Sequence, residues 1–186
     1  PQNGIYDITA GDDSWDSSDQ NFFAWVTHDY EAVYVAVDVT DPNVVNDSAG
    51  AGTEDGPTWQ DDSVEIFFDA DDSNDAERGT AGFEGQYVFS ANGARRDNEA
   101  NNPAFGKSGD WFAATTRTGK GYQVEFKIKK SALSNPADGA GLGFNIAIND
   151  DDGQNGSRKA QLNWSGRPHS EFTYGRLILG EGDGGG

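Results

Sequence analysis

A run of aromatic and acidic residues at positions 59–75 concentrates the side chains that could bind a ligand. Trp59 opens the run, Glu65 stands inside an apolar segment at 64–68, and aspartates crowd both flanks of that segment. An indole packs against the apolar face of a sugar ring, while carboxylates and amides accept hydrogen bonds from its hydroxyl groups. Carboxylate oxygens are also the ligands that Ca²⁺ prefers. The run therefore predicts a saccharide site, a calcium site, or both.

The apolar segment at 64–68 predicts the β-strand that positions these groups. Side chains alternate between the two faces of a strand, so Glu65 shares a face with Phe67. The opposite face carries Val64, Ile66 and Phe68 and predicts the core side. We expect the face with Glu65 to meet a ligand or a cleft.

Three acidic clusters could hold calcium: the run at 69–75, the end of a strand expected at 142–149, and a group of Asp41, Asn43 and Asp47. Two carboxylates about 4 Å apart repel by roughly 4 kcal/mol at an effective dielectric constant of about 20, and a bound Ca²⁺ relieves that repulsion. The run at 69–75 lacks the central glycine and closing glutamate of an EF-hand. The alternative is that these aspartates cap turns through hydrogen bonds to the backbone. The predicted calcium ligands are Asp41, Asp69, Asp71, Asp75, Asp150 and Asp152.

Short apolar runs separated by glycine, asparagine and aspartate predict an all-β fold, a jelly-roll-like antiparallel β-sandwich of about nine or ten strands. A helical turn is expected at 129–133 and a loop at 92–107. The valines at 33, 35, 37 and 39 mark the core side of their strand. The expected strands lie at 4–9, 22–28, 32–39, 64–68, 86–91, 111–116, 121–129, 142–149, 159–164 and 172–179.

The length of 186 residues fits one domain. We expect an N-terminal segment at 1–21 with a donor or edge strand, a sandwich at 22–179 and a glycine-rich tail at 180–186. The chain begins without methionine and has no apolar run long enough to span a membrane, so we expect a mature secreted product or an excised module.

The composition excludes several classes of function. A net charge of −19, from 32 acids and 13 bases, repels nucleic acid and anionic membranes and attracts divalent cations. The alternative is an acidic surface that serves solubility, as in a salt-adapted organism. The absence of cysteine excludes disulfides, thiolate metal sites and a cysteine nucleophile. His28 and His169 belong to no metalloprotease motif, and no serine lies in a nucleophile elbow, so we expect no catalysis.

Several of these segments together resemble the family 9 carbohydrate-binding modules and the wider group of DOMON-like β-sandwiches. The resemblance is carried by Trp59 with the sequence Asp-Ser-Val-Glu-Ile-Phe-Phe-Asp at 62–69, preceded by Val-Tyr-Val-Ala-Val at 33–37 and Asp-Pro at 41–42. Gly-Phe-Asn-Ile-Ala-Ile-Asn-Asp at 143–150 and Gly-Arg-Leu at 175–177 follow in the same order. The likeness covers residues 23–179. Some DOMON-like domains bind haem, which we do not expect here because methionine is absent.

The resemblance implies a saccharide site with Trp59 as an aromatic plate and Glu65 and Gln86 as polar groups at its rim. In the family, an arginine stands where this chain has Val88, and a second tryptophan precedes the last strand. Here Arg95 or Arg96 could supply the guanidinium. His169 or Phe172 could supply the second plate.

Two hypotheses for function follow. The first is an extracellular, non-catalytic calcium-binding module that binds a glycan through Trp59, Glu65, Gln86, His169 and Phe172. The second is a structural subunit of a calcium-stabilised extracellular filament, tube or surface layer, a homopolymer in which the N-terminal strand complements a neighbouring copy. The second hypothesis draws on the replaced arginine and tryptophan, the acidic surface and the glycine-rich tail.

Overall fold

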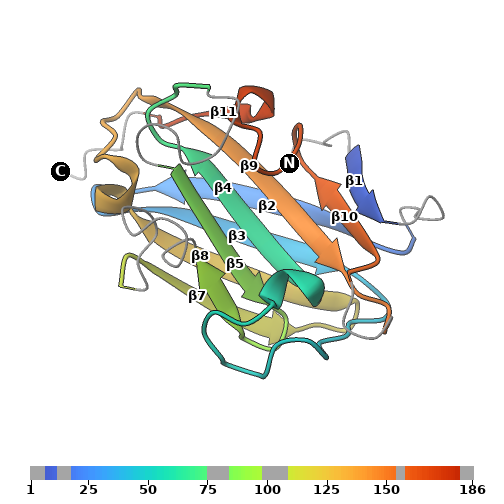
Figure 1. Cartoon of the computed structure of the whole chain (residues 1–186). Coiled ribbons are helices and arrows are strands. Elements are labelled where there is room, and N and C mark those ends of the chain that lie inside the picture. Colours follow the sequence, from blue (N-terminus) through green and yellow to red (C-terminus); the bar gives the residue numbers. More distant parts are fainter. Residues whose placement is uncertain (1–6, 12–17, 75–83, 98–108, 154–157, 181–186) are drawn as a thin grey trace.

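The computed structural model describes residues 7–11, 18–74, 84–97, 109–153 and 158–180. Two antiparallel sheets pack face to face, one of seven strands and one of four (Figure 1). The predicted all-β, jelly-roll-like sandwich is therefore confirmed. No helix in the described residues is long and apolar enough to cross a membrane.

The seven-stranded sheet has the order β1-β10-β9-β4-β5-β6, and β11 also pairs with β9. The four-stranded sheet has the order β2-β3-β8-β7. The strands of the larger sheet are β1 (Asp7–Gly11), β4 (Ser63–Asp69), β5 (Glu84–Ser90), β6 (Arg95–Asp97), β9 (Gly141–Asp150), β10 (Ala160–Asn163) and β11 (Gly175–Ile178). Those of the smaller sheet are β2 (Asn21–His28), β3 (Ala32–Thr40), β7 (Trp111–Arg117) and β8 (Gly121–Lys129). The 3₁₀-helices are η1 (Thr58–Gln60), η2 (Lys130–Leu133) and η3 (Glu171–Thr173).

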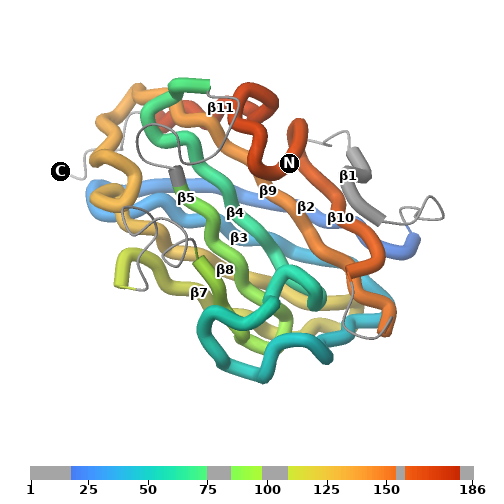
Figure 2. Tube along the Cα trace, in the orientation of Figure 1, coloured from blue at the N-terminus to red at the C-terminus, as the bar shows by residue number. Residues whose placement is uncertain are grey.

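The core lies between the two sheets and follows the alternation of the strands. The valines of β3 at 33, 35, 37 and 39 are buried in it, as expected. Val64, Ile66 and Phe68 of β4 meet them from the opposite sheet. Figure 2 shows the chain passing from β3 of the smaller sheet to β4 of the larger one and from β8 to β9, so residues distant in sequence meet at the strand ends.

The structure differs from the sequence-based expectations at two segments, and at β1 it matches the edge-strand alternative. β6 lies inside the segment expected as a loop, because a three-residue strand of two arginines and an aspartate carries no alternating apolar signal. The last expected strand begins as η3, and β11 starts only at Gly175. β1 pairs with β10 of the same chain, antiparallel and at the edge of the larger sheet.

Candidate functional site

The outer face of the seven-stranded sheet carries two of the predicted saccharide residues, Glu65 of β4 and Gln86 of β5. The pairing of β4 with β5 and β9 places Glu65 opposite Val88 and Ala147. This face points away from the core, as the alternation of β4 predicts. It is nevertheless buried, since Glu65 is only 2% exposed and Phe67 is fully covered.

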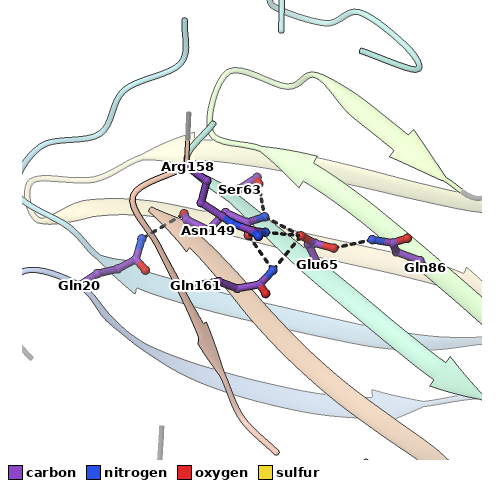
Figure 3. A network of polar contacts seen from close by, with 7 residues as sticks. All are labelled: Gln20, Ser63, Glu65, Gln86, Asn149, Arg158 and Gln161. Carbon is purple, nitrogen blue, oxygen red and sulfur yellow. Dashed lines mark hydrogen bonds and ion pairs between the residues drawn. The ribbon is translucent and has the colours of Figure 1, made fainter. Parts of the chain in front are cut away.

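Glu65 lies at the centre of a polar network on this face (Figure 3). Its Oε1 accepts hydrogen bonds from Asn149 Nδ2 at 2.7 Å and Gln161 Nε2 at 3.1 Å. Its Oε2 accepts one from Gln86 Nε2 at 2.5 Å. The Arg158 guanidinium forms an ion pair with Glu65 across 3.8 Å. A buried carboxylate is therefore held by three amides and one cation that come from four different segments.

Further hydrogen bonds fix the Asn149 side-chain amide, which donates to Glu65. Asn149 Oδ1 accepts from both Arg158 and Gln161 at 2.8 Å, and its Nδ2 also donates to Ser63 Oγ at 2.9 Å. Gln20, just before β2, donates to the Asn149 carbonyl at 3.1 Å. Burial lowers the pKa of the Arg158 guanidinium, and the charge of Glu65 opposes that shift. The network presents amide donors, a carboxylate acceptor and a cation, the groups that recognise hydroxyls.

Trp59 lies in η1, directly before β4, and is half-buried. The Arg96 guanidinium carbon lies 4.7 Å from the centroid of its ring, and Arg96 Nη1 donates to the Asp55 carbonyl at 2.8 Å. Arg96 pairs with Val88, the position where the family arginine was expected. Arg95 instead stacks over Trp111 at 4.0 Å. Of the two proposed arginines, Arg96 is the one beside the predicted plate.

His169 and Phe172 lie in the connection between β10 and β11. The His169 ring meets Phe67 edge to face, with centroids 5.4 Å apart, and Phe67 is two residues along β4 from Glu65. Phe172 in η3 is 60% exposed. Thr173 closes this connection, because its hydroxyl donates to Ser170 O at 2.6 Å and accepts from Arg167 N at 2.8 Å. The fold thus brings His169 to the face of Glu65 and leaves Phe172 facing solvent.

A cluster of three buried aspartates lies where the two sheets meet at one end. One carboxylate oxygen from each of Asp41, Asp62 and Asp150 lies within 4.8 Å of the others. Asp41 follows β3, Asp62 precedes β4, and Asp150 ends β9. Asp150 is 1% exposed, and neither of its carboxylate oxygens has a hydrogen-bond partner in the described residues.

Burial raises the pKa of each of the three aspartates in this cluster. Burial, helped by the charges of Asp152, Asp19 and Asp41, raises the pKa of Asp150 to about 7. Burial and the neighbouring Asp41 raise the pKa of Asp62 to about 10. A hard cation bound between the three carboxylates would satisfy Asp150 and relieve the repulsion.

A second acidic group already contains a cation from the protein. Asp19, Asp150 and Asp152 bring carboxylate oxygens together. The Lys159 ammonium lies 3.2 Å from Asp19 and forms a close ion pair with Asp152. Asp152, predicted as a calcium ligand, is therefore held by Lys159 and also accepts a hydrogen bond from Asn43.

Two further predicted calcium ligands, Asp69 and Asp71, do not join the three-aspartate cluster. Asp69 accepts hydrogen bonds from the backbone N–H groups of Ser73 and Asn74, and Asp71 accepts one from Ser73. These bonds match the turn-capping alternative. Asp75 lies outside the described residues.

Sequence reasoning missed Asp62 as a cluster member. The residue stands within the run singled out at 59–75, directly before the strand that pairs with β9. That pairing sets Ser63 opposite Asn149, so the neighbouring Asp62 and Asp150 end close together. The feature of the sequence that could have identified Asp62 is an acidic residue at the end of each of two strands that pair.

Comparison with known proteins gives consistent matches. The family model described as "Carbohydrate family 9 binding domain-like" matches residues 5–181. Endo-1,4-beta-xylanase A of Thermoanaerobacterium saccharolyticum is 31% identical over 158 residues, which are 81% of this chain and 12% of that protein. The chain therefore spans a small part of that relative's length.

Two similar solved structures are of a family 9 carbohydrate-binding module from Caldicellulosiruptor kristjanssonii. One is in complex with cellotriose, with a TM-score of 0.70, 23% identity and coverage of 97% of this chain and 85% of that one. The other is in complex with glucose, with a TM-score of 0.69, 23% identity and coverage of 97% and 87%. Both share the fold. Because the family model covers nearly the whole chain, the resemblance found in the sequence is confirmed, and the protein belongs to the family 9 carbohydrate-binding modules.

Proposed function

We propose that the chain is a non-catalytic module that binds a neutral saccharide on the outer face of its seven-stranded sheet. The observation that carries the proposal is the network around Glu65 (Figure 3), with Trp59 and Arg96 stacked at the same face. Complexes of similar modules with cellotriose and glucose support this class of ligand.

The geometry favours an exchange of hydrogen bonds on binding. Gln86 is half-buried and bonded to Glu65, so a sugar hydroxyl can replace its amide on the carboxylate or bond to the amide itself. Trp59 supplies an apolar plate at one end of β4. Near the other end, His169 packs on Phe67, and the same connection carries the exposed Phe172.

The surroundings of Glu65 favour binding over hydrolysis. Glycoside hydrolysis needs a second carboxylate across the scissile bond. In the described part of the chain, the groups bonded to Glu65 are amides and a guanidinium, none of which can share general acid and base roles with it. A carboxylate fixed in this way serves as a hydrogen-bond acceptor.

We also propose that Asp41, Asp62 and Asp150 bind one Ca²⁺. The support is the convergence of three buried carboxylates and the two unpartnered oxygens of Asp150. The ion would join the segment after β3 of one sheet to the ends of β4 and β9 of the other. We place the module outside the cell, where polysaccharides are found and calcium is plentiful.

The filament hypothesis has less support. It requires an N-terminal strand free to pair with a neighbouring copy, whereas β1 pairs with β10 within the chain. Light scattering with calcium and with a chelator tests it directly, since a homopolymer would grow on addition of calcium. A mass near 19.9 kDa in both conditions would exclude calcium-driven assembly.

Isothermal titration calorimetry with glucose, cellotriose and xylotriose tests the saccharide proposal. Trp59→Ala should weaken binding by about tenfold or more, because it removes the apolar plate. Tyr30→Ala is the matched control, since Tyr30 is 87% exposed in the turn between β2 and β3. Equal affinity of Trp59→Ala and the wild type would refute the proposed site.

A further inference from the structure

The outer face of the four-stranded sheet carries a second concentration of aromatic side chains. This sheet lies behind the seven-stranded sheet in Figure 1, so its outer face is on the opposite side of the molecule from Glu65. Trp25 and Phe23 of β2 are 51% and 43% exposed, and Phe112 of β7 is 53% exposed. Large aromatic groups gathered on one solvent-facing sheet are typical of a binding surface.

A hollow of about 530 Å³ opens on this face. The residues that line it from the outer side are Trp25 and Thr27 of β2, Tyr34 and Ala36 of β3, and Glu125 of β8. We call these five residues the Trp25 platform. The register explains the hollow, since Trp25 pairs with Ala36 and Ala36 pairs with Glu125. The small alanine leaves a depression between an indole and a carboxylate.

The side chains of the Trp25 platform divide into fixed and free groups. Tyr34 is fixed, because its hydroxyl donates to Asp29 at 2.8 Å and the Lys127 ammonium lies 5.7 Å from its ring centroid. Within the described residues, by contrast, Glu125 accepts no hydrogen bond and forms no ion pair, and the Trp25 indole N–H donates to no acceptor. The fixed Tyr34 ring thus lies beside the Glu125 carboxylate, an acceptor, and the Trp25 indole N–H, a donor, both of which can bond to a ligand.

We propose that the Trp25 platform is a second saccharide-binding site, specific for a neutral polysaccharide chain. A sugar ring has an apolar face that can cover Trp25 and hydroxyl groups that can bond to Glu125 and Thr27. The net charge of −19 disfavours acidic polysaccharides and nucleic acid. A protein surface docked here would bury the Glu125 charge unless it supplied a cation, whereas a hydroxyl satisfies the carboxylate directly.

The aromatic surface continues beyond the hollow. Phe23 stands two residues from Trp25 on β2, while Phe112 lies in the same cross-strand row as Thr27, Tyr34 and Lys127. Four strands at about 4.8 Å spacing put β2 and β7 roughly 14 Å apart, farther than one sugar ring extends. The surface therefore fits several consecutive residues of a polysaccharide better than a monosaccharide.

A comparison of soluble and insoluble ligands tests this second site. The wild type, Trp25→Ala, Glu125→Ala and the control Tyr30→Ala are each incubated with microcrystalline cellulose and with insoluble xylan, and the unbound protein is measured. Cellotriose affinity is measured in parallel by calorimetry. Thermal melts establish that each variant is folded.

We expect Trp25→Ala to reduce the partition coefficient on at least one polysaccharide by about tenfold, and Glu125→Ala to reduce it less, with Tyr30→Ala unchanged. Cellotriose affinity should not change in any of them. The proposal would be overturned if Trp25→Ala and Glu125→Ala both had the same partition coefficient as the wild type. It would also be overturned if neither polysaccharide retained the wild type. A dimer in solution that Trp25→Ala dissociates would overturn it as well, because the occupant would then be a second copy. Trp59→Ala distinguishes the two sites. If this variant binds cellotriose with wild-type affinity, the Glu65 site is refuted and the proposal for the Trp25 platform is unaffected.

Discussion

The two outer faces of the sandwich differ from an ordinary protein surface in opposite ways. One buries polar side chains, and the other exposes large aromatic side chains. On the seven-stranded sheet, Glu65, Asn149 and Gln161 are buried, and their polar atoms bond to one another. On the four-stranded sheet, Trp25 and Phe112 are half-exposed. The polar groups of a buried face must be satisfied by internal hydrogen bonds, whereas an exposed aromatic face meets solvent.

The difference separates two kinds of binding surface. The Glu65 face is preorganised, because each polar group is already oriented by a neighbour, and a ligand gains specificity by exchanging particular hydrogen bonds. The Trp25 platform has a large aromatic surface and few hydrogen-bonding groups. Such a surface suits the repeating units of a polysaccharide better than the end of a sugar chain. Substitutions on the Glu65 face should therefore lower mainly the stability of the fold. Substitutions on the Trp25 platform should lower mainly the affinity for a ligand.

The largest contrast is expected between the two outer-face glutamates. Glu65→Ala should lower the free energy of unfolding by about 3 kcal/mol, because it removes the carboxylate that Arg158 and three amides share, two of them buried. Glu125→Ala should change it by less than about 0.5 kcal/mol. Urea denaturation of both variants measures the difference. Similar values for the two would show that burial of Glu65 does not determine its contribution.

Calcium should affect the end of the sandwich where Asp41, Asp62 and Asp150 meet. At a calcium concentration a hundred times the Kd, binding to the native state adds about 2.7 kcal/mol to the free energy of unfolding. Chelation should therefore lower the melting temperature of the wild type and leave that of Asp150→Asn nearly unchanged. Asp71→Asn is the control, since Asp71 is exposed and only caps a turn. A wild-type melting temperature insensitive to chelator would exclude a stabilising ion.

A smaller effect is expected at the stack of Trp59 and Arg96. A double-mutant cycle of Trp59→Ala and Arg96→Ala should give a coupling free energy of about 0.5–1 kcal/mol, the range of a partly exposed cation–π pair. Denaturation of the four proteins of the cycle measures it. A coupling near zero would mean that Arg96 is placed by its bond to Asp55 alone.

The smallest effect is expected on the exposed aromatic face. Trp25→Tyr retains an aromatic plate and should change the free energy of unfolding by less than about 0.5 kcal/mol. The same denaturation assay serves here, with polysaccharide retention as the second measurement. A large loss of stability would show that Trp25 contributes mainly to packing, and the contrast between the faces would weaken.

Local sequence pattern was sufficient where one face of a strand is apolar. β3 and β4 could be predicted with their core sides because their side chains alternate over several residues. β6 could not, since a short polar edge strand exists only through its pairing with β5. Trp59, Glu65 and Gln86 were identified through the family resemblance, and the common face of Glu65 and Gln86 follows from the register of β4 and β5.

The cluster of Asp41, Asp62 and Asp150 shows the limit of the same reasoning. Two of its members, Asp41 and Asp150, were among the predicted ligands, whereas Asp62 was not. Asp69 and Asp71 looked equally acidic in the sequence, yet they bond to the backbone of their own turn. Acidic composition identifies candidates but does not distinguish carboxylates that converge from those that cap turns.

The sequence by itself determined the all-β class, the core faces of the main strands, the exclusion of cysteine chemistry and the family. These depend on side-chain period and composition, which are local or summed properties of the chain. Only the tertiary structure decided that Glu65 is buried among amides, that Asp62 joins Asp41 and Asp150, and that Ala36 alone separates Trp25 from Glu125 in a cross-strand row. Each of these depends on which strands pair and in which register. Such pairing brings together residues that are far apart in the sequence, and their contact cannot be inferred from the local sequence pattern.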